Sequence, residues 1–199
     1  ANIRQQGLTL FQKAIDFCAD IGIRTIQVAG YYDYYGVIDQ DTERRYLDGL
    51  AQGVEWAAKA GVMLGVETME GEHVVDSITR AMYFVHLLDS PWFQVYPDLG
   101  NIAAHGFDLR TELGRGRGHI VGIHVKDARP GEPRRVPFGE GVVPFVDAFR
   151  KIAEMQFSGP IMIEMWNDNN PDSMQIIAAA RKWVVDRMIE APLFVEAPT

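Results

Sequence analysis

Four side chains of metal-binding types stand at or near the ends of four separate apolar runs. Glu67 closes the run VMLGVE, Asp98 closes FQVYPD, Glu164 closes IMIE, and His124 lies within IVGIHVKD. A charged group at the end of a buried strand is costly unless it has a partner. Three carboxylates and one imidazole suit a divalent ion such as Mn²⁺, Zn²⁺ or Co²⁺. These residues are therefore predicted to bind one metal ion.

Apolar runs of strand length alternate with stretches of helical periodicity along the chain. Strands are predicted at 23–30, 62–67, 93–98, 119–125 and 161–166, and helices at about 7–21, 43–60, 72–89, 107–116, 144–156 and 171–190. The strand runs are almost continuously apolar, which is typical of a parallel sheet covered on both faces. Residues 99–106 and the stretch 127–141, rich in proline and glycine, are predicted to be loops.

This order of elements predicts an α/β fold of the (β/α) TIM-barrel type, with parallel strands, in a single domain over residues 1–199. Active sites of such barrels lie at the carboxyl ends of the strands. A complete barrel has eight strands in about 250 residues, whereas five strands are predicted here. The chain starts with Ala1 and enters a helical pattern almost at once. We therefore expect the interior of a longer protein, without the first three strand–helix units.

Composition narrows the classes of function. With 47% hydrophobic and 23% charged residues, the chain is expected to form a globular core. Its net charge of −8, with only small basic clusters, argues against a nucleic-acid partner. No apolar run approaches the roughly 20 residues needed to span a membrane. The single cysteine, Cys18, allows no disulfide within the chain, so we expect a cytoplasmic protein with no membrane partner.

Six motifs carry a family resemblance over essentially the whole chain: IQVAGYYDYYG, GVETM, WFQVYPDLGN, HIVGIHVKD, VPFGEGVVPF and IEMW. They resemble the L-ribulose-5-phosphate 3-epimerase (L-xylulose-5-phosphate 3-epimerase) family of xylose-isomerase-like TIM barrels, from its fourth to its eighth strand. The resemblance implies that Glu67, Asp98, His124 and Glu164 bind one divalent metal ion, and that Glu67 and Glu164 also act as the acid/base pair. It further implies a role in ascorbate and pentulose catabolism and, with the tyrosine-rich loop after Gly30, a homodimer.

The implied chemistry is consistent with these residue types. Epimerising a carbon beside a ketone requires removal of a C–H proton and return of a proton to the opposite face. A metal ion on the carbonyl and neighbouring hydroxyl oxygens stabilises the enediolate, while two carboxylates on opposite sides act as base and acid. We therefore expect metal-dependent inversion of C3 in a ketopentose 5-phosphate, between L-ribulose 5-phosphate and L-xylulose 5-phosphate.

Three further residues are candidates for contacting the substrate. Lys126 follows His124 on the same strand end and is expected to touch substrate oxygens or phosphate, or else to form an ordinary ion pair. Asn101 lies three residues beyond Asp98, where its amide can bond a sugar hydroxyl. Trp166, two residues past Glu164, is expected either to wall the pocket or to pack in the core.

The arginines of the stretch 127–141 are candidate phosphate ligands. Arg134 or Arg135, with Gly139, Glu140 and Gly141, would form a cradle of guanidinium and backbone N–H groups around a phosphate. The alternative is an ordinary solvated loop. The sugar phosphate is thus the expected small-molecule partner.

Two other interpretations of function stay open. An aldose–ketose isomerase, an unphosphorylated ketose 3-epimerase or a keto-inositol dehydratase of the same barrel group would use nearly the same metal site. Alternatively, since five strands cannot close an eight-stranded barrel and open edges invite pairing with another chain, the chain is a non-catalytic fragment or oligomerisation module.

Overall fold

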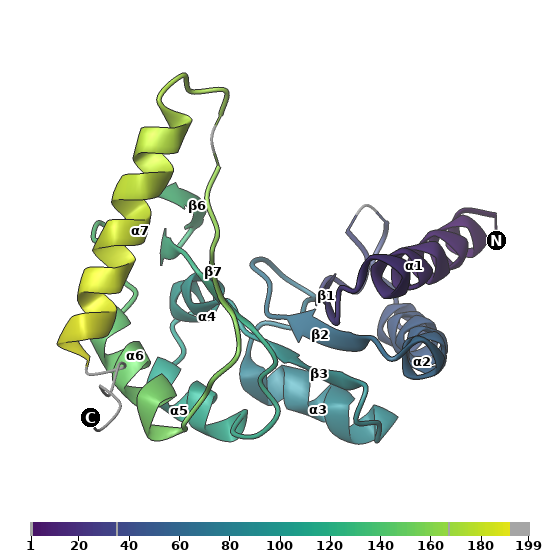
Figure 1. Ribbon diagram of the computed structural model, residues 1–199. Helices are drawn as coiled ribbons and strands as arrows, with labels where there is room; N and C mark the ends of the chain where they lie inside the picture. The colour runs from purple at the N-terminus through teal and green to yellow at the C-terminus, as the bar shows by residue number, and fades with distance from the viewer. Residues whose placement is uncertain (1, 35, 167, 192–199) are drawn as a thin grey trace.

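The structure, a computed structural model, describes residues 2–34, 36–166 and 168–191 (Figure 1). None of the helices in these ranges is long and apolar enough to cross a membrane. The elements follow one another as α1 (Asn2–Ile21), β1 (Thr25–Ala29), α2 (Thr42–Ala60), β2 (Met63–Glu67), α3 (Ile78–Leu88), β3 (Phe93–Tyr96), α4 (Leu99–Ala104), α5 (Leu109–Arg115), β4 (Ile123–Val125), β5 (Asp127–Arg129), β6 (Glu132–Val136), α6 (Phe145–Glu154), β7 (Ile161–Ile163) and α7 (Ser173–Glu190).

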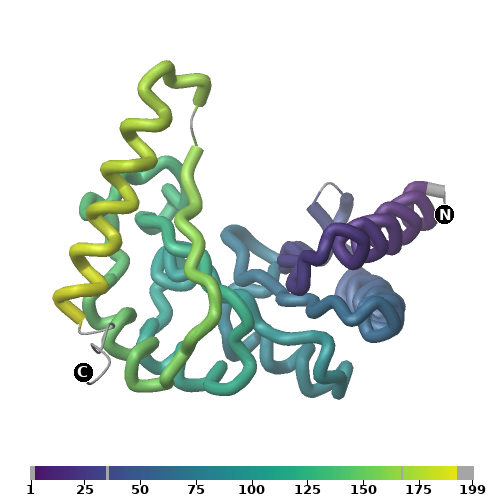
Figure 2. The backbone as a smooth tube through the Cα atoms, in the orientation of Figure 1, coloured from purple at the N-terminus to yellow at the C-terminus, as the bar shows by residue number. Residues whose placement is uncertain are grey.

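Five strands run parallel in the order β1-β2-β3-β4-β7. The first three form one sheet, and β4 pairs with β7. Two isolated parallel bridges, Val95 with Ile120 and Asp98 with His124, join the two parts between β3 and β4. Within the described residues, β1 and β7 pair on one side only, so the strands form an open part of a barrel (Figure 2). The predicted (β/α) architecture with five parallel strands is confirmed.

Helices cover the outer face of these strands. α2 packs on β2 and α3 on β3, which buries Leu64, Val66 and Val95 completely. Local capping residues delimit α3 at its start and α2 at its end. The Ser77 side chain accepts the Arg80 N–H at the start of α3, and Gly61, with φ 69°, closes α2 in the left-handed conformation that glycine adopts without strain.

The inner face of the strands is less completely covered by other side chains than predicted. Side chains alternate along a strand, so the residues opposite the apolar outer positions are Gln27 on β1, Gly65 on β2 and Met162 on β7. Met162 is 54% exposed and Gln27 is half-buried. The expectation of strands covered on both faces therefore holds for the outer face alone.

Two predicted loops contain regular structure. Residues 99–104 form α4, which at six residues is too short to give an apolar periodicity. Residues 127–136 form the antiparallel hairpin β5–β6, where Pro130 and Gly131, with Gly131 at φ 78°, make a two-residue turn. β6 reads EPRRV and has no apolar alternation, and its proline is tolerated because an edge strand leaves one side unpaired.

A glycine substitution tests the contact between β1 and the loop after β2. A Cβ on Gly30 would lie 2.3 Å from the Glu67 carbonyl oxygen and 2.7 Å from Val75 Cβ. We expect Gly30→Ala to lower the free energy of unfolding by about 1–3 kcal/mol, through overpacking. In the matched control Gly49→Ala, within α2, the added Cβ meets nothing within 4 Å, so stability should rise by about 0.5–1 kcal/mol. Urea denaturation measures both, and equal effects would contradict the prediction.

Candidate functional site

Four side chains converge where β2, β3, β4 and β7 end. One ligand atom from each of Glu67, Asp98, His124 and Glu164 lies within 4.8 Å of the others. Glu67 is the last residue of β2, Asp98 follows β3 by two residues, His124 lies in β4, and Glu164 directly follows β7. The four residues that the sequence singles out thus form one cluster in the structure.

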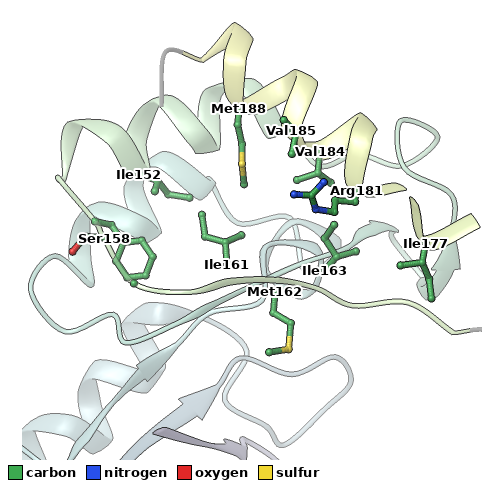
Figure 3. A pocket seen from close by; sticks show the side chains of 12 residues that line it. Ile152, Ser158, Ile161, Met162, Ile163, Ile177, Arg181, Val184, Val185 and Met188 are labelled. Carbon is green, nitrogen blue, oxygen red and sulfur yellow. The ribbon is translucent and has the colours of Figure 1, made fainter. Parts of the chain in front are cut away.

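The alternation of side chains along the strands directs this convergence. Figure 3 shows Ile161 and Ile163 of β7 pointing toward α7, whereas Met162 points to the other side of the strand. Glu164, two residues on, follows Met162 and faces the cluster. Backbone bonds fix the strand ends, since the His124 N–H donates to Pro97 O at 2.9 Å and the Glu164 N–H to Val125 O at 3.0 Å.

The Glu67 carboxylate is held at both oxygens. The Gln27 side-chain amide donates to Oε2, and His124 Nδ1 lies 2.5 Å from Oε1. The His124 ring also packs edge-on against Tyr96, with 4.8 Å between ring centroids. Glu164 Oε2 lies 3.7 Å from the same Nδ1, so both glutamates approach one nitrogen of the imidazole.

Asp98 caps α4 with one oxygen and turns the other to the cluster. Oδ1 accepts the Asn101 N–H at 2.8 Å, and the Asp98 N–H donates to the Thr68 hydroxyl at 2.8 Å. Oδ2 is buried and accepts no hydrogen bond from the described residues, and the same is true of Glu164 Oε2. Burial raises the pKa of the Asp98 carboxyl well above its usual range; the charge of Lys126 opposes this shift and nearby Glu164 adds to it.

Lys126 is the cation inside this group of carboxylates. Its Nζ lies 3.5 Å from Asp98 Oδ2 and 3.5 Å from Glu164 Oε2, and it is almost fully buried. Nζ also lies 5.2 Å from the ring centroid of Trp166. The predicted ion pair is therefore present, and Trp166 lies against the site.

A divalent cation fits the donor set of this cluster. Buried polar atoms in folded proteins almost always have a hydrogen-bond partner, yet among the described residues Asp98 Oδ2 and Glu164 Oε2 accept no hydrogen bond and have only ion-pair contacts, at 3.5 Å with Lys126 and, for Glu164, at 3.7 Å with His124. Three carboxylates and one imidazole are the ligand types that Mn²⁺, Zn²⁺ and Co²⁺ accept. These residues can hold one metal ion.

The Asn101 side chain is more buried than expected for a residue that contacts a sugar. Its side chain is completely buried, and Nδ2 donates to the Thr68 carbonyl at 2.9 Å. Its Oδ1 has no hydrogen-bond partner among the described residues. The amide thus ties the first turn of α4 to the strand end at Thr68, and a contact with a sugar hydroxyl stays a prediction.

Arg134 is anchored at the mouth of the site. Its guanidinium bonds Glu70 and reaches the Tyr31 hydroxyl at 3.4 Å, and it lies 5.8 Å from the ring centroid of Trp166. Burial alone would raise the pKa of Glu70, yet a backbone hydrogen bond, Lys126 and Arg134 hold that pKa below its usual value. Glu70 is therefore ionised, and Arg134 is already neutralised by a carboxylate.

Arg135 lies in a separate ion pair at the surface. Its guanidinium donates two hydrogen bonds to the Asp168 carboxylate, with Nε–Oδ2 and Nη2–Oδ1 distances of 2.8 Å. Both residues line a small cavity of about 190 Å³ that Lys126, Glu164 and Trp166 also line. This cavity adjoins the cluster and is open to a small ligand.

The predicted cradle around Gly139, Glu140 and Gly141 is wrong. The N–H groups of Gly139 and Gly141 donate to Asp127 Oδ2 at 2.8 and 2.9 Å. The buried Asp127 carboxylate occupies the position that a phosphate would take, and a Cβ on Gly141 would lie 2.0 Å from its Oδ1. These glycines shape a structural turn and are not available to a ligand.

A larger groove of about 670 Å³ lies on the outer side of β7, against α6 and α7 (Figure 3). Its lining is apolar except for Arg181 and Ser158 and includes none of the four clustered residues. It carries no group able to bind a metal or move a proton, so size alone does not locate the site.

Three contributors to the site escaped the sequence analysis: Gln27, Thr68 and Glu70. Gln27 interrupts the apolar run of β1 at an inner-face position, which is a usable signal, and Thr68 directly follows Glu67. Nothing in the sequence marks Glu70, because its partner Arg134 lies 64 residues away.

Comparison with known proteins supports the architecture. A family described as xylose isomerase-like TIM barrel matches residues 1–187. The L-ribulose-5-phosphate 3-epimerase UlaE of Escherichia coli O157:H7 is 47% identical over 189 residues, which are 95% of this chain and 66% of the relative. UlaE of Escherichia fergusonii is 46% identical over the same lengths. The chain thus spans just under two thirds of these curated relatives.

Solved structures share the fold at low sequence identity. An L-ribulose 3-epimerase superposes with a TM-score of 0.80 at 17% identity, covering 94% of this chain and 68% of that one. A D-allulose 3-epimerase from Methylomonas sp., solved with D-allulose, gives 0.76 at 15% identity, with 92% and 69% covered. With a family match over residues 1–187 and these parallel strands, the chain belongs to the xylose isomerase-like TIM barrel family.

Proposed function

We propose that this protein is a metal-dependent epimerase that inverts C3 of a ketopentose 5-phosphate, L-ribulose 5-phosphate or L-xylulose 5-phosphate. The observation that carries the proposal is the convergence of Glu67 and Glu164 on the imidazole of His124, with Asp98 beside them. The identity of 46–47% to curated L-ribulose-5-phosphate 3-epimerases supports this substrate class.

Glu67, Asp98, His124 and Glu164 would hold one divalent ion, Zn²⁺, Mn²⁺ or Co²⁺. When bound, such an ion polarises the C2 carbonyl and stabilises the negative charge that develops as C3 loses its proton. Asp98 is suited to this role because one oxygen is fixed by the Asn101 N–H while the other accepts no hydrogen bond from the described part of the chain.

The two glutamates supply the proton transfers. A planar C3 can accept a proton on either face, and inversion requires that the proton leaves one face and arrives on the other. Glu67 and Glu164 reach the cluster from β2 and from the end of β7, and both lie near the His124 imidazole. One carboxylate takes the proton from C3, the other returns one to the opposite face, and their roles exchange in the reverse direction.

The cavity beside the cluster is the candidate site for the phosphate end. It is lined by Lys126, Arg135 and Trp166, which offer two cations and an aromatic wall. Arg135 is more exposed than Arg134 and its pair with Asp168 lies in solvent, so a phosphate can replace Asp168 at little cost. Arg134 would then fix Trp166 and the mouth of the site.

An unphosphorylated ketose 3-epimerase is the second candidate. The observation in its favour is that Arg134 and Arg135 are both paired with carboxylates, Glu70 and Asp168.

A homodimer and the absence of a nucleic-acid partner stay predictions.

Loss of one ligand tests the metal site. We expect about one Mn²⁺ per chain, and Asp98→Asn should weaken Mn²⁺ binding more than about 100-fold, since even residues that only support a ligand contribute 10–100-fold. Asp108→Asn is the matched control, because Asp108 caps α5 through the Thr111 N–H as Asp98 caps α4. Calorimetric titration measures both, and equal affinities would contradict the assignment.

Removal of either proton-transfer group tests the acid/base pair. Glu67→Gln and Glu164→Gln should each slow proton exchange at C3 of the ketose by about 10²–10⁴-fold. Deuterium incorporation, followed by NMR at saturating metal, gives the rate. Glu112→Gln changes a carboxylate about as buried as that of Glu67, one that binds Thr79 and Arg115, and should leave exchange unchanged. Exchange retained in both site variants would remove these two roles.

Comparison of sugars tests the phosphate assignment. We expect a higher kcat/KM for the 5-phosphate than for the free pentulose, and Arg135→Met should reduce this preference by roughly 10–100-fold, as loss of a charge-assisted hydrogen bond predicts. Arg44→Met, which removes another exposed paired arginine, serves as control. Equal turnover of both sugars would favour the unphosphorylated ketose epimerase.

A further inference from the structure

Gln27 is an inward-facing amide on the edge strand of the parallel sheet. In the β1–β2 register Gln27 lies opposite Gly65, one inner-face position below Glu67. The space above Gly65 is filled by the side chains of Val121 and Tyr96, and the Gln27 amide reaches past this position to Glu67 Oε2. Neither the proton transfers nor the metal ligands account for this residue.

The two most buried carboxylates of the cluster are restrained in the same manner. Glu67 has Oε2 bound to the Gln27 amide, while Oε1 turns to His124. Asp98 has Oδ1 bound to the Asn101 N–H, while Oδ2 turns to the cluster and has no hydrogen bond within residues 2–34, 36–166 and 168–191. In each case one oxygen is fixed by an N–H donor outside the cluster and the other faces its centre. The site thus contains two prepared one-oxygen ligands.

We propose that Gln27 is a positioning residue that makes Glu67 a one-oxygen metal ligand. This inference rests on the proposed function. The amide prevents the carboxylate from turning both oxygens to the cation, and it keeps Oε2 in one orientation for the proton at C3. Such supporting hydrogen bonds typically change metal affinity by about 10–100-fold. The residue acts only through Glu67.

Gln27→Met tests the inference, because methionine keeps the length and loses the N–H donor. We expect its dissociation constant for Mn²⁺ to rise about 10–100-fold in calorimetric titration of the whole chain. At saturating Mn²⁺, kcat for C3 exchange should fall while KM for the ketose 5-phosphate stays the same. Gln94→Met is the matched control, since Gln94 lies near the start of β3 and bonds His119 and Pro91. It should bind Mn²⁺ as the unsubstituted protein does.

The outcomes separate this inference from the proposed function. Equal Mn²⁺ affinity of Gln27→Met and the unsubstituted protein overturns the positioning role and leaves the epimerase proposal standing. No Mn²⁺ binding by the unsubstituted protein overturns both. Thermal unfolding without metal shows whether each variant folds. If Gln27→Met does not fold, Gln27→Asn takes its place, because its amide is one methylene too short to reach Oε2. Its Mn²⁺ affinity is then compared with that of the unsubstituted protein in the same way.

Discussion

Mutual repulsion among the clustered carboxylates is the constraint on which the rest of the site depends. Ligand atoms of Glu67, Asp98, His124 and Glu164 lie within 4.8 Å, and two like charges at about 4 Å repel by on the order of 4 kcal/mol at an effective dielectric constant of 20. The protein offsets part of this with the buried ammonium of Lys126. Burial is the larger cause of the raised pKa of the Asp98 carboxyl, and nearby Glu164 adds to it. A cation bound at the centre would reduce the repulsion between the carboxylates and would lower the pKa of Asp98.

The parallel sheet is what enforces this crowding. Glu67 lies opposite Ala29 and Tyr96 in the strand registers, and the bridge between Asp98 and His124 continues the same edge toward β4. A shift of one residue in any strand would turn its functional side chain to the outer face, under the helices. The buried outer residues, such as Val66 and Val95, therefore fix the inner site as well as the core.

Apolar runs and their end residues were enough to predict the five strands and the four clustered side chains. What the sequence could not reveal depends on contacts between distant residues or on short elements. The β5–β6 hairpin has a polar strand and an edge proline, so no apolar period marks it. Glu70 and Arg134 meet across 64 residues. The hydrogen bond between Gln27 and Glu67 joins residues 40 positions apart on neighbouring strands.

Asp98 and Asp127 show why residue type and position alone do not define function. Both are buried aspartates beside strand ends, and by residue type both are suited to bind a cation. Both oxygens of Asp127 accept hydrogen bonds, from the N–H groups of Ala128, Gly139, Gly141 and Val143. Asp98 has one oxygen to which no residue that the structure describes donates a hydrogen bond. A buried carboxylate whose hydrogen bonds are complete stabilises a turn, whereas one with an unsatisfied oxygen aimed at other ligands is prepared for an ion.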